Sequence, residues 1–321
     1  MLFRSANAQN IQLRERWTSK AVPAFEVVTS IAGMAEAPDG TLWLSDPRNH
    51  VIHGVESAGA SVRTVARSGD GPSEVRSPNF ITTTPDGGLA VYDMDHRAIQ
   101  VFDRSGKFRH RVALSALVRN PKGFTMTPTG AFVISGGIYG NEYAIHRFGI
   151  NGSLERSWLP APKTADMQTG ILIAGGPIAV LRRGTLLFSR AAPHELIEFS
   201  LDSNTLRTIA ADPTLLKAVD NDFVTETGSG SGRVRSFRWN FPQSRAVFQL
   251  SDGRILNVIS SVEAGTSLWQ LYTSEGGFLS QTRIDRAYIP WFVTRSGDIL
   301  SSYIDPDTHE HIAVRLEMRT R

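Results

Sequence analysis

The chain has 321 residues, of which 41% are hydrophobic and 20% charged, and its net charge is +3. These values are ordinary for a globular protein, and the charge is far below that of a typical nucleic-acid-binding domain. The sequence contains no cysteine, which excludes disulfides, thiol catalysis and cysteine-ligated zinc. No apolar stretch approaches the roughly 18 residues that a membrane span needs. We therefore expect neither a nucleic-acid partner nor a membrane span.

Residues 1–9 are predicted to be a disordered tail that keeps the end of a secretory signal. Ala6, Asn7 and Ala8 match the A-x-A pattern of a cleavage site, although the charged and apolar regions that should precede it are missing. The pattern predicts a secreted or periplasmic protein. The next predicted element is a single strand, Ile11 to Trp17.

A short strand, a two-residue turn and a second strand then recur six times. The clearest copies cover residues 35–46 and 82–93, and each has an Asp-Gly turn. Such a turn joins antiparallel strands because glycine tolerates the positive φ that a tight hairpin requires. The turn glycines are Gly40, Gly87, Gly130, Gly184, Gly253 and Gly297.

Most of these glycines lie about 45 residues apart, which is the length of a four-stranded propeller blade. Each unit continues into a third and a fourth strand, but the last one ends after its third strand, Ile312 to Met318. The strand at Ile11 to Trp17 can complete that blade and leave no open sheet edge. The sequence therefore predicts one all-β domain over 10–321, a six-bladed β-propeller closed by its N-terminal strand.

The second unit resembles an NHL repeat, through Gly69 to Pro78, Pro85-Asp86-Gly87 and Ile99 to Asp103. Asp46 to Ile52 in the first unit is similar to the D-x-x-N-x-R-I element of that family, with His50 in place of the usual arginine. The match covers 30–114 and then fades. It implies an NHL-like propeller, a fold that is a binding platform in many proteins. A minority of such propellers are enzymes, including metal-dependent lactonases and a zinc lyase.

Two connections between blades are long, at 161–175 and 211–244. In a propeller these connections lie on the face where the innermost strands begin, which we call the entry face. The Asp-Gly turns lie on the opposite face, which we call the hairpin face. Loops on a rigid scaffold commonly carry function. We expect Arg235, Arg238 and Trp239 of the second insertion to form a lid that clamps an anionic or planar ligand.

Aligning the inner strands on their turns predicts which residues line the central channel. At the entry-face mouth they are Ala32, Asn79, Lys122, Gly176, Arg245 and Ile289, and Trp291 lies slightly deeper. Towards the middle they are Glu36, Thr83, Met126, Val180, Gln249 and Val293. We expect Asn79, Lys122, Arg245 and Trp291 to contact the ligand.

The resemblance also suggests an enzymatic alternative. Lactonase-type propellers hold Ca²⁺ with carboxylate and amide oxygens of the inner strands, and this cation prefers 6–8 oxygen ligands. Here Glu36 and Asn79 would hold Ca²⁺ or Zn²⁺. His53 and His146 occupy the same register of the third strand in two different blades, so we do not expect them to share a metal.

The first hypothesis is thus an exported, monomeric binding module without a cofactor, which recognises a small anionic, sugar or peptide ligand at the channel mouth. The alternatives are a metal-dependent lactonase-like hydrolase or lyase, and a platform for protein–protein interaction. The residues favour binding over catalysis without deciding between them.

Overall fold

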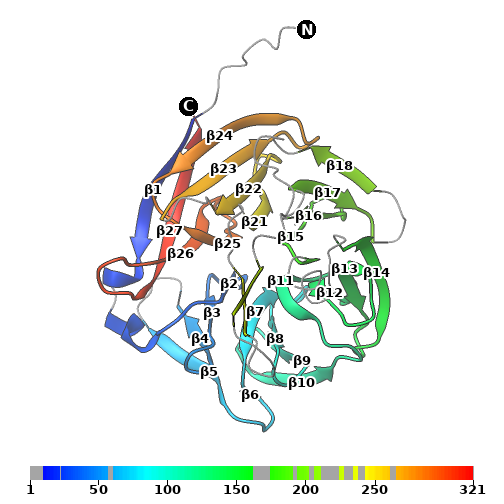
Figure 1. Ribbon diagram of the computed structural model, residues 1–321. Coiled ribbons are helices and arrows are strands. Elements are labelled where there is room, and N and C mark those ends of the chain that lie inside the picture. The colour runs from blue at the N-terminus through cyan, green and yellow to red at the C-terminus, as the bar shows by residue number, and fades with distance from the viewer. Residues whose placement is uncertain are drawn as a thin grey trace, which may run out of the picture.

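The computed structural model describes residues 10–21, 23–56, 61–161, 174–190, 194–201, 206–210, 224–227, 234–237, 243–260 and 265–320. Six antiparallel blades surround a central channel (Figure 1), which confirms the predicted six-bladed propeller. The predicted tail at 1–9 lies outside the described residues.

The first three blades follow one another along the chain. Blade 1 comprises β2 (Gly33–Glu36), β3 (Leu42–Asp46), β4 (Val51–Val55) and β5 (Val62–Ser68), with the short β6 (Glu74–Val75) added in parallel to β5. Blade 2 comprises β7 (Pro78–Thr83), β8 (Leu89–Asp93), β9 (Ala98–Phe102) and β10 (Phe108–Ala113). Blade 3 comprises β11 (Arg119–Met126), β12 (Phe132–Gly137), β13 (Tyr143–Phe148) and β14 (Leu154–Pro160).

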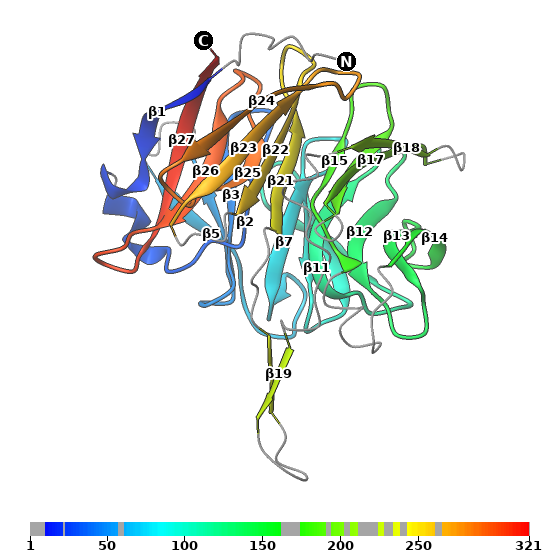
Figure 2. The same cartoon turned by 45° about the horizontal axis from the view of Figure 1, so that its top comes forward.

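The next two blades flank the second insertion. Blade 4 comprises β15 (Ile178–Val180), β16 (Leu186–Arg190), β17 (Glu195–Phe199) and β18 (Leu206–Ala210). Blade 5 comprises β21 (Gln243–Gln249), β22 (Ile255–Ser260), β23 (Ser267–Tyr272) and β24 (Phe278–Ile284). Between them, β19 (Val224–Thr227) and β20 (Val234–Phe237) pair as a hairpin, which stands away from the disc in Figure 2.

Blade 6 closes the ring with strands from both ends of the chain. It comprises β25 (Ile289–Val293), β26 (Ile299–Ile304), β27 (His311–Thr320) and β1 (Ile11–Thr18). The pairing of β1 with β27 runs from Ile11 opposite Thr320 to Thr18 opposite Val314. The predicted closing strand is therefore confirmed. Two 3₁₀ turns, at Ser19–Ala21 and Pro23–Val27, lead from β1 into blade 1.

The hydrophobic core lies between neighbouring blades. Every residue of β8 and β9 is buried, whereas the outer strand β10 is mostly exposed. Middle strands are covered on both sides, so they are mostly apolar along their length rather than alternating, and the polar exceptions Asp93 and Gln100 are buried. One cluster joins Trp43 and Ile52 of blade 1 to Leu89 and Phe102 of blade 2.

A buried side chain at one position of the second strand connects each of the first four blades to the next one. The position lies five residues after the turn glycine, and its donors in blades 1 to 4 are Ser45, Tyr92, Ser135 and Ser189. Ser45 and Ser135 donate to the carbonyls of Pro78 and Gly176, where the next inner strands begin. Tyr92 donates to the Val118 carbonyl over 3.1 Å, and Ser189 to Asn257 Oδ1 over 3.0 Å.

Two buried carboxylates secure the connections into blades 1 and 2. Asp46 accepts hydrogen bonds from the Thr29 amide at 2.8 Å and the Ser30 hydroxyl at 2.6 Å. Asp93 accepts from the amides of Arg76 and Ser77, both at 2.9 Å. Burial alone would raise the pKa of Asp46, but these hydrogen bonds lower it below its usual value. Both aspartates therefore have structural roles at the entry face.

Ring closure should depend on the buried face of β1. Ile11 is 2% exposed and packs into the blade 6 cluster, whereas its neighbour Gln12 is exposed. We expect Ile11→Ala to lower the free energy of unfolding by about 2–4 kcal/mol, because it leaves a cavity in the closing contact. Gln12→Ala should change it by less than about 0.5 kcal/mol. Chemical denaturation measures both, and equal effects would contradict this account of closure.

Candidate ligand-binding channel

Each residue that the sequence predicts to contact a ligand lies at an irregularity of its inner strand. The ladder register shifts at Asn79 in β7, at Asn120 to Lys122 in β11, at Arg245 in β21 and at Trp291 in β25. A bulged residue leaves the ladder and its side chain is re-aimed, which is why bulges are common beside binding sites. β2 and β15 pair without such a shift.

Lys122 and Arg245 come from different blades and lie close enough for their charges to interact. Burial and the neighbouring Arg245 guanidinium lower the pKa of Lys122 to about 8. Burial also lowers the pKa of Arg245, although this side chain keeps solvent-exposed surface. Both observations fit a channel mouth, where protein surrounds a group that still reaches water. The Arg245 charge, which comes from a separate repeat, thus acts on Lys122.

The other two residues contact their own blades. The Asn79 amide donates to the Ser77 carbonyl at 3.2 Å and to the Ser77 hydroxyl at 2.8 Å. Ser77 is in turn held by the buried Asp93. The Trp291 indole nitrogen donates to Ser302 Oγ at 2.8 Å, and its ring lines the channel. Asn79 and Trp291 are therefore fixed in place by neighbouring hydroxyls.

All six inner strands line a cavity of about 600 Å³ in the channel. The lining includes Thr83, Met126, Val180, Gln249 and Val293, which the strand alignment places towards the middle. Lys122 precedes the lining residue Phe124 by two positions, which corresponds to about 7 Å along a strand. Trp291 belongs to the lining, whereas Asn79, Lys122 and Arg245 lie nearer the strand starts and do not line this largely neutral cavity. The lining also includes Thr82 and Thr84, on either side of the predicted Thr83. The sequence did not single out these two, because threonine is also common in strands that carry no ligand.

The predicted lid falls mainly outside the described residues. Arg238 and Trp239 are not described, and Arg235 is placed only as part of the strand β20. Its backbone pairs with Glu226 of β19. The role of these three residues in a lid stays a prediction.

Glu36, the carboxylate of the metal alternative, points to a different partner. Arg315 of β27 donates to it over 3.3 Å, and Glu36 does not belong to the channel lining. Gln249 Oε1 accepts from the Arg182 amide at 2.7 Å. Asn79 and Glu36 share no contact that the structure describes. The proposal of Ca²⁺ or Zn²⁺ at Glu36 and Asn79 stays a prediction.

The histidines of the third strands lie in separate blades, as their register predicts. His146 contacts the Gly136 carbonyl at 3.1 Å and Ser157 Oγ at 2.9 Å, while His53 is buried beside Asp46. Burial lowers the pKa of His146 to about 4, so it is neutral at physiological pH. Within the described part of the chain, no three His, Asp or Glu side chains are grouped so that they could hold a metal ion.

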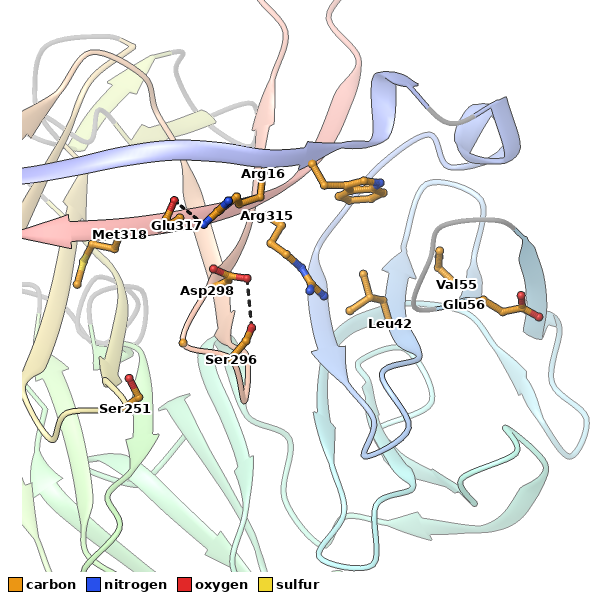
Figure 3. A pocket seen from close by; sticks show the side chains of 12 residues that line it. Arg16, Leu42, Val55, Glu56, Ser251, Ser296, Asp298, Arg315, Glu317 and Met318 are labelled. Carbon is orange, nitrogen blue, oxygen red and sulfur yellow. Dashed lines mark hydrogen bonds and ion pairs between the residues drawn. The ribbon is translucent and has the colours of Figure 1, made fainter.

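A second pocket, of about 760 Å³, lies on the hairpin face between blades 6 and 1 (Figure 3). Two of its lining arginines are paired: Arg16 lies 2.9 Å from Glu317, and Arg315 lies 3.3 Å from Glu36, which is outside the lining. Ser296 donates to Asp298 at 3.2 Å. The sequence predicts no ligand contact at this pocket.

The comparisons with known proteins support the fold. No protein-family model matches the sequence, and no curated protein is similar to it; the NHL resemblance thus stays a prediction. Among solved structures, a DUF4221 family member from Bacteroides vulgatus has a TM-score of 0.66 at 8% identity, with 97% of this chain and 99% of that one covered. Virginiamycin B lyase from Staphylococcus aureus has a TM-score of 0.54 at 11% identity, with 97% of this chain and 88% of that one covered. A gluconolactonase from Xanthomonas campestris has a TM-score of 0.56 at 14% identity, with 98% of this chain and 96% of that one covered. At these low identities, the TM-scores above 0.5 establish a shared propeller fold alone.

The lowered pKa of Lys122 should make the free energy of unfolding depend on pH. Below pH about 8 the lysine is protonated in both the folded and unfolded states, and the folded state bears the cost of burying the charge. As pH rises towards 10.5, only the unfolded state keeps the proton, so the free energy of unfolding should rise, by at most about 3 kcal/mol. Denaturation across pH 7–11 should show that Lys122→Met removes this rise. Lys107→Met, at an exposed turn, is the control and should retain it.

Proposed function

We propose that this protein is an exported binding module that recognises a small anionic ligand at the entry-face mouth of its channel. The observation that carries the proposal is a pair of cations, Lys122 and Arg245, which lie at irregularities of two inner strands and interact electrostatically. Each lies at a strand irregularity, each has its pKa lowered by burial, and their like charges repel. Perturbed groups in a cleft are a physical signature of functional sites.

An anion between the two cations would relieve their repulsion. Arg245 offers a planar fork that matches carboxylate or phosphate oxygens, and Lys122 adds a compact charge. Asn79 and Trp291 would supply a polar contact and an aromatic surface at the rim. The neutral part of the ligand would extend towards Thr83 and Met126 in the cavity. Arg235, Arg238 and Trp239 would close over the bound ligand.

The proposal of export is supported by the A-x-A pattern at Ala6 to Ala8. A structural neighbour from Bacteroides fragilis, described as a candidate exported protein, has a TM-score of 0.63 at 8% identity and covers 99% of this chain. No helix among the described residues is long and apolar enough to cross a membrane.

Anion binding should raise the melting temperature, because a ligand that binds only the folded state stabilises it. We expect lactate or inorganic phosphate to raise the melting temperature of the wild-type protein. Lys122→Ala and Arg245→Ala should each weaken the apparent affinity about tenfold or more, which is about 1.4 kcal/mol or more. The wild-type affinity should also fall as pH rises through about 8, where Lys122 loses its proton. Scanning fluorimetry and calorimetry measure these effects.

Lys107→Ala removes one exposed cation remote from the channel and should leave affinity unchanged. If the ligand shift survives both Lys122→Ala and Arg245→Ala, the proposed site is wrong. If no anion or oligosaccharide shifts the melting temperature, the flat faces would instead serve as a platform for a protein partner.

Adding metal ions tests the alternative that the protein is a metal-dependent hydrolase or lyase. We expect Ca²⁺ or Zn²⁺ to leave the melting temperature unchanged, because Glu36 is paired with Arg315. A rise with either ion that disappears in Glu36→Gln and in Asn79→Ala would favour the metal-dependent enzyme. Thermal unfolding with and without a chelator makes the comparison.

A further inference from the structure

A cavity of about 780 Å³ lies on the entry face, at the joint between blades 6 and 1. Its lining comes from the two 3₁₀ turns and the connection that follows them, from the loop between β3 and β4, and from the loop between β26 and β27 with the start of β27. In Figures 1 and 2 the red loop of blade 6 lies beside the blue 3₁₀ turns. This cavity is separate from the channel, because the two cavities share no lining residue.

Buried hydrogen bonds hold two walls of this cavity together. The Arg48 amide donates to Ser30 Oγ at 3.1 Å, and the Ser30 hydroxyl donates to the buried Asp46 at 2.6 Å. The Asn49 side-chain amide donates to Asp46 at 3.1 Å and to the Val27 carbonyl at 3.4 Å. The loop between β3 and β4 is therefore fixed against the connection into blade 1.

His311 ties the wall from blade 6 to the same connection. Its Nδ1 accepts from the Ile31 amide at 3.3 Å, which leaves the ring proton on Nε2 when the imidazole is neutral. Burial and the Arg48 guanidinium lower the pKa of His311, so the neutral form prevails at pH 7. His311 therefore offers the cavity a neutral N–H donor near the charge of Arg48.

Arg48 and Glu26 line the cavity with opposite charges. Each is adjacent in sequence to a residue of the contact between Asn49 and Val27, so the two side chains start from adjoining backbone segments. Both are exposed, and among the described residues neither side chain has a hydrogen-bond or ion-pair partner. A cation and an anion thus line one cavity without neutralising each other.

The lining has one other lysine or arginine and one other carboxylate, and both are engaged within the protein. Lys20 pairs with Asp305, and Glu310 accepts from the Thr308 hydroxyl at 3.1 Å. An ion of a single sign would be attracted by one of the two remaining charges and repelled by the other. A ligand that carries one charge of each sign would satisfy both.

We propose that this cavity binds a free α-amino acid with an apolar side chain. Arg48 would hold the carboxylate through its planar fork, with His311 as a second donor, and Glu26 would hold the ammonium. Both charges of an amino acid are attached to one carbon, which suits opposite charges carried on adjoining segments. The ligand side chain would lie against Phe25 and Ile312, which are buried and line the cavity. This site goes beyond the channel site and does not depend on it.

The test is calorimetry on the full chain at pH 7 with L-leucine, L-methionine and L-phenylalanine as probes. L-leucinamide lacks the carboxylate, and N-acetyl-L-leucine lacks the ammonium. We expect at least one amino acid to bind, and for leucine we expect each blocked compound to bind about tenfold more weakly or worse, because each loses a charged hydrogen bond. Equal affinities for leucine and N-acetyl-L-leucine would overturn the assignment of an amino acid.

Two exposed substitutions test the assigned contacts. Arg48→Gln and Glu26→Gln should each weaken leucine binding about tenfold, because each removes one charged partner. Glu26→Gln should leave N-acetyl-L-leucine within about twofold of wild type, since that compound has no ammonium to lose a partner. The matched controls are Arg182→Gln, at the hairpin of blade 4, and Glu142→Gln, in a loop of blade 3; both residues are exposed, and neither change should alter leucine binding. Circular dichroism verifies that all variants are folded.

The variant Lys122→Ala separates this site from the channel, because it should weaken lactate binding and leave leucine binding unchanged. If Lys122→Ala abolishes leucine binding and Arg48→Gln does not, the amino acid binds in the channel and this inference is wrong. If none of the three amino acids binds while lactate does, this inference fails and the channel site stands. Leucine binding that depends on Arg48 and Glu26, in a protein that ignores lactate, would support this site and remove the other.

Discussion

The arrangement of the channel depends on one contact that recurs in blades 1 to 3, a buried side chain that ties the second strand to the start of the next inner strand. Ser45 bonds to Pro78, directly before Asn79. Ser189 and Ser244 both donate to Asn257 at 3.0 Å, and Ser244 directly precedes Arg245. In blade 6 the same position, Ser302, instead accepts from Trp291 of its own inner strand. A hydroxyl buried without a partner costs about 1–3 kcal/mol, so these contacts fix the strand starts strongly.

Fixed strand starts allow the inner strands to be irregular where the ligand would bind. A bulge breaks ladder hydrogen bonds, and two neighbouring cations repel each other; both features reduce stability. The apolar contacts between blades, such as Trp43 against blade 2, supply stability away from the channel. This division explains how Lys122 and Arg245 can be held close together.

The regular spacing of the turns placed some channel residues correctly and others wrongly. The turn glycines located the inner strands, so residues at equal distances from the turns, such as Thr83 and Met126, were correctly placed in the channel. Glu36 has the same register, yet it turns to Arg315 of the neighbouring blade. A register gives the depth of a residue along a strand but not the rotamer of a long side chain, which the nearest opposite charge selects. The hydroxyl contacts between blades were missed because Ser45 and Tyr92 differ chemically and share only a position.

The sequence by itself determined the number of blades, the closure by the N-terminal strand and the depth of each inner-strand residue. These follow from local signals, because an Asp-Gly turn and alternating strands need no distant partner to be recognised. Only the tertiary structure decided that Lys122 and Arg245 interact and that Asn79, Lys122, Arg245 and Trp291 all lie at strand irregularities. Contacts between blades, and the burial that shifts a pKa, depend on surfaces that meet only when the ring has closed.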